Sequence, residues 1–450
     1  MTEPLMTRFP LIRYAGPDAV VALRGGLPVT ARTFLGAIAA LAEQLPNREH
    51  VLNLCSDRLA FAIGLGAALS RGQVSLLPPN NMPTMLRQLG DSYPGMICLT
   101  DPGTRYADVE CLEVPSADSF KTASPPVPSF PTEQVAALAF TSGSTGQPMP
   151  QVKTWGTLVR SVRGAGTALS IPALGPAGLV GTVPHQHMYG LESVILLSLQ
   201  HGLVLHAGRP FYPADIAANL GELDCRRILV TTPVHLRTLL ADGAAVPPLD
   251  FILSATAPLA PQLATDAEVR LSAPLHEIYG CSETGQLAVR RTRTTAEWQC
   301  IDGIRLHQDV RGTWASGDFL DRETLLADVI ELNAVDRFIL HGRSADQVNI
   351  AGKRSSLAYL NHHLNSIDGV RDGVFFMPDE NESGGMTRLT AFAVAPDLSV
   401  EAVMARLRER IDPAFMPRPF RLVNTLPRNA MGKLTREALA RLLDDPPSGE

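Results

Sequence analysis

The sequence predicts an α/β protein with a large, multi-lobed N-terminal domain of helix-covered sheets and a small, mobile α+β C-terminal domain. Short apolar runs alternate with helical patterns from Asp18 to about Leu340, which is typical of parallel sheets covered by helices. The pattern changes just after Gly342. The chain has 450 residues, more than one hydrophobic core of ordinary size needs. We therefore expect two domains, residues 1–342 and 343–450.

Short apolar runs define the strands that we expect in the large domain. They are Val51–Leu54, Met96–Leu99, Ala136–Phe140, Gly202–Leu205, Arg227–Val230 and Phe251–Leu253. The segment Ala123–Pro131 is rich in proline, which is excluded from helix interiors and central strands, so we expect an extended connector there. The strand-like run Arg337–Leu340 ends the large domain, and the small one combines strand Thr390–Val394 with helix Glu401–Arg410.

Composition excludes several classes of protein. The net charge of −6 argues against a nucleic-acid binder that uses a global positive field. The six cysteines show no C-x-x-C spacing, so neither a zinc site nor a disulfide framework is expected. We find neither a signal-peptide pattern nor an apolar run long enough for a membrane span. These observations predict a cytoplasmic protein.

The run Thr141–Gly146, which reads TSGSTG, directly follows one of the expected strands. Its glycines let the backbone bend, and its hydroxyls and amides can surround anionic oxygens, as in a phosphate loop. It lacks the Gly-Lys pair that ends a P-loop, so an ordinary P-loop ATPase is excluded. Alone, such a hexamer is equally an ordinary surface turn.

Four later segments carry groups that suit a nucleotide. His276–Glu283 supplies an aromatic ring for adenine and a carboxylate for magnesium. Asp318, in Ser-Gly-Asp, offers a carboxylate to ribose hydroxyls, and Arg343 adds a fixed cation. Lys433 follows a glycine in a C-terminal loop and can act as a point charge. Each segment alone also fits a plain turn or a solvated side chain.

Together and in this order, the five elements resemble the adenylate-forming superfamily of acyl-CoA synthetases, peptide-synthetase adenylation domains and luciferases. The resemblance covers the chain from about residue 136 to 440. It implies that a carboxylic acid is activated by ATP with Mg²⁺ as an acyl-adenylate. The acyl group is then transferred to a thiol.

The resemblance also implies roles for individual residues. Lys433 is the adenylation lysine, Glu283 ligates Mg²⁺, and Ser282 touches the α-phosphate. Ala345 and Asp346 form the hinge. ATP or AMP is bound by Thr141, Ser142, Gly143, Ser144, Thr145, Gly146, Ala255, Thr256, Ala257, Glu277, Ile278, Tyr279, Gly280, Ser282, Asp318 and Arg343. The acid pocket is lined by His187, Met188, Tyr189, Ser254, Ala255, Tyr279 and Gly280. His187 matches the gate of that pocket, or alternatively is a satisfied histidine at a strand end.

The chain departs from the family pattern at two places. Pro148-Met149-Pro150 stands where the family has Pro-Lys-Gly, so the usual pyrophosphate lysine is missing and Lys153 is a candidate substitute. In the hinge, Ala345 stands where aspartate is common and Asn349 where lysine is usual. The hinge function then shifts to Asp346.

The acid pocket favours a small, hydroxylated aromatic acid. Val183–Leu191 contains no aspartate to bind an α-ammonium group, which disfavours an amino acid. The expected lining is mostly apolar with a few polar tips, and comprises His187–Leu191, Ser254–Ala257 and Tyr279–Leu287. Gln147–Leu158 is similar to the aryl-acid ligases of aryl polyene (xanthomonadin-type) pigment pathways. That similarity implies a hydroxybenzoate as the acid and an acyl carrier protein as the acceptor.

The acceptor and the activity itself leave alternatives open. Basic residues outnumber acidic ones between Met404 and Arg441, which suits an acidic carrier protein, although an ordinary solvated face explains them equally. An aryl or medium-chain acyl-CoA ligase that uses coenzyme A is one alternative. A catalytically silent adenylate-binding regulator is the other.

Overall fold

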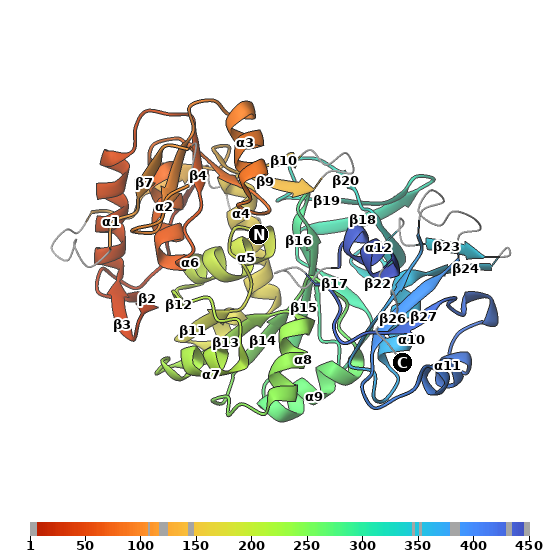
Figure 1. Ribbon diagram of the computed structural model, residues 1–450. Helices are drawn as coiled ribbons and strands as arrows, with labels where there is room; N and C mark the ends of the chain where they lie inside the picture. The colour runs from red at the N-terminus through yellow and green to blue at the C-terminus, as the bar shows by residue number, and fades with distance from the viewer. Residues whose placement is uncertain are drawn as a thin grey trace.

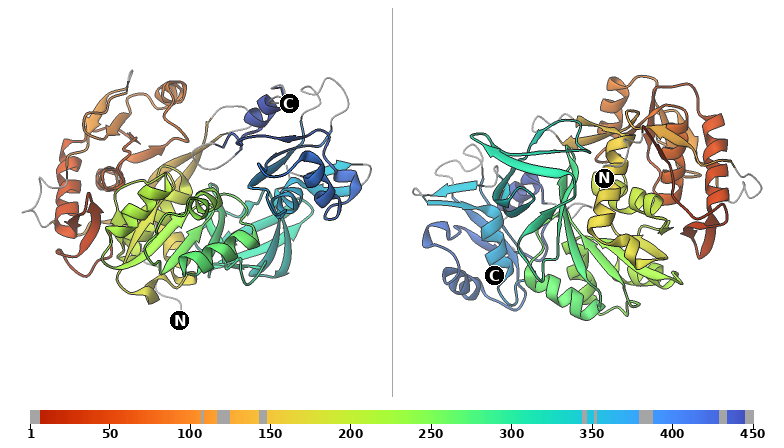
Figure 2. Two further views of the ribbon diagram at one scale, coloured as in Figure 1. Left: turned by 60° about the horizontal axis from the view of Figure 1, so that its bottom comes forward. Right: turned by 180° about the vertical axis from the view of Figure 1, so that it is seen from behind.

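The computed structural model describes residues 7–106, 109–116, 125–142, 148–343, 347–350, 353–378, 388–428 and 434–444. The chain forms two large helix-covered sheets followed by smaller C-terminal sheets, seen from three sides in Figures 1 and 2. The α/β architecture predicted from the alternating pattern is confirmed. Among the described residues, we find no helix that combines the length and the apolar character needed to cross a membrane.

The first large sheet has six strands in the order β10-β9-β5-β4-β6-β7. Its neighbours are parallel except β10, which runs antiparallel to β9. The strands are β4 (His50–Asn53), β5 (Val74–Leu77), β6 (Ile97–Thr100), β7 (Cys111–Glu113), β9 (Val135–Ser142) and β10 (Pro148–Thr154). Three helices belong to this part, α1 (Ala31–Gln44), α2 (Arg58–Ser70) and α3 (Pro83–Ser92). The three expected strands of this region are confirmed.

The second large sheet has eleven strands in the order β21-β22-β17-β16-β15-β14-β13-β11-β12-β2-β3. They are β2 (Val20–Arg24), β3 (Leu27–Thr30), β11 (Ala177–Gly181), β12 (Val204–His206), β13 (Arg226–Thr231), β14 (Phe251–Ser254), β15 (Leu275–Cys281), β16 (Gly285–Arg290), β17 (Trp298–Cys300), β21 (Asp328–Ala334) and β22 (Arg337–Arg343). The run from β2 through β15 is parallel, as expected. From β15 to β21 neighbours are antiparallel, since no helical crossovers separate them along the chain.

Helices cover both faces of the parallel half of this sheet. One face packs on α7 (Pro213–Gly221), α8 (Pro233–Asp242) and α9 (Pro261–Leu271), each with proline in its first turn. The other face packs on α4 (Trp155–Ala168) and on a helix of three consecutive parts. These parts are α5 (Met188–Gly190), the π-helical turn Leu191–Leu196 and α6 (Leu197–His201).

Two small sheets complete the N-terminal part. The end of the expected connector Ala123–Pro131 is not merely extended, because Ser129–Pro131 (β8) pairs with Arg8–Pro10 (β1). This two-stranded sheet tolerates the prolines because both of its strands are edges. A three-stranded sheet contains β18 (Ile304–Asp309), β19 (Gly312–Gly317) and β20 (Thr324–Leu325).

The C-terminal part has hydrophobic cores of its own, formed by residues from Val348 onward. Its elements are β23 (Gln347–Ile350), β24 (Lys353–Ser356), α10 (Leu357–Asn365), β25 (Asp372–Phe376), β26 (Thr390–Val394), α11 (Val400–Arg408), β27 (Phe420–Leu422) and α12 (Arg436–Asp444). The expected strand and helix of this region are confirmed. The proposed boundary after Gly342 falls inside β22 and stays a prediction.

Asp372 connects the C-terminal part to the rest of the molecule. Its Oδ1 lies 3.1 Å from a guanidinium nitrogen of Arg237 on α8. Arg428, from the C-terminal part itself, binds the same carboxylate at 2.8 Å. The ion pair with Arg237 therefore fixes one position of the C-terminal elements against α8.

Candidate active site

A pocket of about 2120 Å³ lies where the carboxyl ends of β5, β9, β14 and β15 approach the helix that begins at Met188. Ligand sites of α/β sheets occur at this edge. Its volume exceeds the roughly 300–1,000 Å³ usual for one small ligand, so there is room for a nucleotide and an acid together. The C-terminal part closes one side with Ser356, Tyr359 and Phe415.

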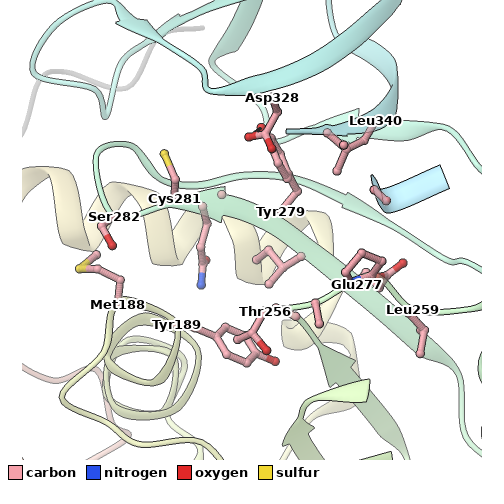
Figure 3. A pocket seen from close by; sticks show the side chains of 18 of the residues that line it. Met188, Tyr189, Thr256, Leu259, Glu277, Tyr279, Cys281, Ser282, Asp328 and Leu340 are labelled. Carbon is pink, nitrogen blue, oxygen red and sulfur yellow. Dashed lines mark hydrogen bonds between the residues drawn. The ribbon is translucent and has the colours of Figure 1, made fainter. Parts of the chain in front are cut away.

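Three separate segments bring twelve of the predicted site residues into this pocket. Figure 3 shows side chains from each segment directed around one space. The residues are His187, Met188, Tyr189, Ala255, Thr256, Ala257, Glu277, Ile278, Tyr279, Gly280, Ser282 and Glu283.

Backbone geometry shapes the wall of the pocket at two points. Thr256 has φ of 79°, in the left-handed region that a β-branched residue rarely adopts, and such strain gathers at functional sites. At Gly280, a Cβ atom would lie 2.0 Å from the carbonyl oxygen of Gly285. Only glycine fits there, so the two strands approach closely beneath the pocket.

Hydrogen bonds fix two tyrosines in the pocket. Tyr189 donates from its hydroxyl to the carbonyl oxygens of Thr231 and Leu253 at 3.0 and 3.1 Å, and burial raises the pKa of this phenol. Tyr279 donates to Oδ2 of Asp328 at 2.7 Å. In Figure 3 the Tyr279 side chain extends from β15 toward Asp328. Both rings are thereby held in one orientation.

Glu277 is held by charge and hydrogen bonding inside the wall. The carboxylate is 2% exposed and accepts a hydrogen bond of 2.7 Å from Nε of Arg290. Thr292 also donates to it. Burial raises the pKa of Glu277, and the Arg290 guanidinium opposes that shift. Since the carboxylate is already paired, Glu277 contributes to the pocket mainly through its position on β15.

The prediction that Asp318 lines the nucleotide site is wrong for this structure. Asp318 is exposed just after β19 and is not among the residues that line the pocket. Asp328 lies in the pocket instead, and its register partner on β22 is Arg343. The hairpin that places Asp328 opposite Arg343 turns at Val335-Asp336, which carries none of the glycine or asparagine residues that usually mark such a turn in a sequence.

Ser254 is a second correction. It was expected in the acid pocket, but it is the last residue of β14, is fully buried and does not line the pocket. The chain turns into the pocket only after it, at Ala255. The parallel strand buries its end within the sheet, and the following turn supplies the contacts.

Lys153, the candidate substitute for the missing phosphate lysine, does not line the main pocket. It lies on β10 with 6% exposure, and its Nζ donates to the backbone carbonyl of Glu283 at 3.0 Å. Burial lowers the pKa of the ammonium, while Glu192 and other acids oppose that shift. Lys153 lines a small cavity beside the main pocket rather than the main pocket itself. Its observed role is to hold the turn that carries Glu283.

Replacement of Lys153 by methionine is expected to destabilise the protein by about 2 kcal/mol, because it removes the donor to the buried backbone carbonyl of Glu283 and the positive charge that favours the ionised form of Glu192. Urea unfolding measures this change. The double variant Lys153→Met/Glu192→Leu removes both charges and should recover most of the loss. Strictly additive destabilisation would contradict an electrostatic coupling between these two groups.

Some predicted residues cannot be placed. Gly143, Ser144, Thr145, Gly146, Ala345, Asp346 and Lys433 lie outside the described residues. For Thr141, Ser142 and Arg343 the structure gives the backbone only. The pairing of Ser142 with Pro148 makes residues 143–147 the link between β9 and β10. Pro148 and Pro150 are accommodated because β10 is an edge strand.

The described residues contain no cluster of three or more His, Cys, Asp or Glu side chains able to hold a metal ion by themselves. Glu283 lies in the turn between β15 and β16, where it is exposed and lines the pocket. Magnesium in nucleotide sites is commonly bound by one or two carboxylates together with the phosphates. A single exposed carboxylate therefore fits Mg²⁺ that arrives with a nucleotide.

Comparisons with known proteins agree with this geometry. Residues 38–304, more than half of the chain, match the model of the family described as AMP-binding enzyme. The 4-coumarate–CoA ligase of Rhodobacter capsulatus is 28% identical over 322 residues, covering 69% of this chain and 76% of that protein.

Solved structures show the same fold. The O-succinylbenzoate coenzyme A synthetase of Bacillus subtilis in complex with AMP has a TM-score of 0.80 at 20% identity, and 97% of each chain is covered. The same enzyme in complex with ATP and a magnesium ion has a TM-score of 0.76 at 18% identity, covering 94% of this chain and 97% of that chain. The likeness extends over the N-terminal and the C-terminal parts.

Proposed function

This chain belongs to the AMP-binding enzyme family, and from that premise we propose that it activates a hydroxybenzoate-type aryl acid with ATP and transfers the acyl group to an acyl carrier protein. The observation that carries the proposal is the joint presence in one pocket of the 255–257 turn, Tyr279 with Asp328, and Glu283. These groups come from distant parts of the sequence. Only folding brings them together.

Asp328, rather than Asp318, binds the ribose in this proposal. Its Oδ2 already accepts from Tyr279, and a carboxylate retains capacity for further donors such as ribose hydroxyls. The neighbouring Tyr279 ring and the turn at Thr256 offer surfaces to the adenine. Arg343, whose backbone pairs with that of Asp328, is the further residue that we assign to the ribose.

The first half-reaction joins the acid to AMP. A carboxylate oxygen of the acid forms a bond to the α-phosphorus of ATP, and the bond from that phosphorus to the pyrophosphate oxygen breaks in line. Lys433 and Ser282 stabilise the charge that develops on the α-phosphate and carboxylate oxygens. Glu283 would hold Mg²⁺ together with the phosphates, and the bound ion would supply positive charge beside the pyrophosphate group. Thr141–Gly146 hold the β- and γ-phosphates.

The second half-reaction requires the thiol to reach the adenylate. The thiolate sulfur attacks the acyl carbon, the carbon–oxygen bond to AMP breaks, and AMP leaves as the anion. Rotation about Ala345 and Asp346 removes Lys433 and opens the path. The Arg237–Asp372 ion pair belongs to one of the two positions and must break in the other.

The identity of the acid and of the acceptor rests on particular side chains. Met188, Tyr189 and Ile278 give the pocket an apolar slot suited to an aromatic ring. On the C-terminal part, Arg406, Arg408 and Arg410 are exposed at α11 and after it, which suits an acidic carrier protein.

Coenzyme A is the second candidate acceptor. It is favoured by the curated relative and the solved structures, which are named as ligases or synthetases of coenzyme A. Both acceptors end in the same phosphopantetheine thiol, so the pocket serves either. The difference lies in what binds outside the pocket.

A panel of carboxylic acids in the ATP–pyrophosphate exchange assay tests the first half-reaction. Exchange is expected with hydroxybenzoates and absent without acid. The best acid is then offered to coenzyme A and to holo acyl carrier protein in parallel, and faster thioester formation on the carrier protein is expected. Preference for coenzyme A would establish the second candidate. Tight AMP binding without exchange on any acid would establish a silent adenylate-binding regulator and defeat the proposal.

A further inference from the structure

A buried carboxyl group borders the pocket without a part in the adenylation chemistry. Glu192 lies in the π-helical turn Leu191–Leu196 and is 3% exposed. It lines both the main pocket and the small cavity that contains Lys153. Single π-helical turns often mark functional sites, since they redirect one side chain from a regular helix.

The packing around Glu192 preserves space for its carboxylate. A Cβ atom at Gly285 would lie 2.7 Å from Oε1 of Glu192, so the neighbouring strand accommodates this group only with glycine at that position. Gly285 also has φ of +77°, which glycine adopts without strain. The missing side chain and the positive φ of Gly285 therefore leave room for the Glu192 carboxylate in this wall of the pocket.

The partners of Glu192 do not exhaust its hydrogen-bonding capacity. The hydroxyl of Ser161 donates to Oε1 at 2.8 Å, and the backbone N–H of Gln286 faces the same carboxyl. Burial raises the pKa of Glu192 to about 7, although Lys153 and these two donors oppose the shift. A carboxylate accepts about four hydrogen bonds, so acceptor sites are left for a ligand.

Gln286, next to Glu192 in the pocket wall, supplies a second observation. It is 5% exposed, and its Nε2 donates to Ser193 Oγ at 2.8 Å. The Oε1 atom of the same amide has no hydrogen-bond partner among the described residues. Buried polar groups are rarely left unpaired in proteins, and a ligand group can complete such a site.

We propose that Glu192 and Gln286 form a subsite for a hydroxyl group on the aromatic ring of the acid, and that Glu192 selects hydroxylated over unsubstituted aryl acids. This inference rests on the proposed function and adds the residue that decides the substrate. The remaining wall is apolar at Met188 and Ile278. An unsubstituted ring would leave Oε1 of Gln286 and the remaining acceptor sites of the Glu192 carboxyl without a donor, and that loss discriminates strongly.

The test compares benzoate, 3-hydroxybenzoate and 4-hydroxybenzoate in the pyrophosphate exchange assay. For the wild type, kcat/KM with the preferred hydroxybenzoate should exceed that with benzoate by about 100-fold, as expected for a hydrogen bond to a charged group. Glu192→Leu should bring this ratio close to one by lowering the rate with hydroxybenzoate. Glu268→Gln is the matched control, because Glu268 is equally buried but binds Arg291 outside the pocket.

A second variant separates selection from folding. Lys153→Met/Glu192→Leu removes both buried charges, so it tests the ratio without an unpaired ammonium. The proposal is overturned if the kcat/KM ratio of hydroxybenzoate to benzoate is unchanged in either variant that folds. It is also overturned if the wild type uses benzoate and hydroxybenzoates equally well. Failure of the proposed function is distinguished by a different result, namely no exchange with any acid.

Discussion

Asp328→Ala is expected to raise the KM for ATP in pyrophosphate exchange by about 100-fold, because hydrogen bonds from two ribose hydroxyls to a carboxylate would be lost. The effect should be smaller with Tyr279→Phe, which removes the donor of the 2.7 Å bond but leaves the carboxylate in place. Steady-state exchange kinetics at varied ATP measure both. The KM for the acid should change little.

The matched control for this experiment is Asp318→Ala. Asp318 is ten positions earlier in the chain, is exposed and lies outside the pocket, so its removal should leave the KM for ATP unchanged. Thermal unfolding of both variants checks that each is folded. A large effect at Asp318 with none at Asp328 would restore the expectation drawn from the Ser-Gly-Asp motif.

Lys433→Ala is expected to lower the rate of adenylate formation by about 1,000-fold, since preorganised charge at the reacting oxygens is among the largest contributions to catalysis. Thioester formation from a preformed acyl-adenylate should be nearly unaffected, because that step needs the lysine to have moved away. Exchange kinetics measure the first step and single-turnover thioester formation the second.

Arg441→Ala gives the control for Lys433. Arg441 is an exposed cation on α12, in the same part of the chain, and its loss should alter neither step. Equal loss of both half-reactions in Lys433→Ala would contradict a role confined to adenylation. Restoration of the first step by arginine at position 433 would indicate that charge alone suffices.

Much of the fold was predictable because hydrophobic runs and helical periodicity are local properties. The strands around Val51, Ile97 and Phe251 were expected within one or two residues of their observed bounds. The mixed character of the large sheet was not expected, because strand direction depends on the connection and not on the strand itself. The hairpin of β21 and β22 shows this, since both strands read as ordinary alternating segments.

The residues of the candidate site likewise fall into those that local sequence motifs predicted and those that only the tertiary structure reveals. Segments in which neighbouring residues act together, such as 255–257 and 277–283, were found from their motifs and all lie in the pocket, with Ser254 the exception at the strand end. Asp328 was missed because a Ser-Gly-Asp motif drew attention to Asp318. Glu192 was missed because a single glutamate in an apolar run gives no local sign of facing a pocket, and the π-helical turn that places it depends on tertiary packing.

The number of residues before the edge strand β10 also matters for function, because it affects the register of that strand. It begins at Pro148, directly after residues 143–147, and it carries Lys153, whose ammonium secures the backbone of Glu283. Side chains alternate between the two faces of a strand, so a slip of β10 by one residue would turn Lys153 to the opposite face. An insertion or deletion that caused such a slip would therefore remove Lys153 from the backbone carbonyl of Glu283, the residue proposed to hold magnesium.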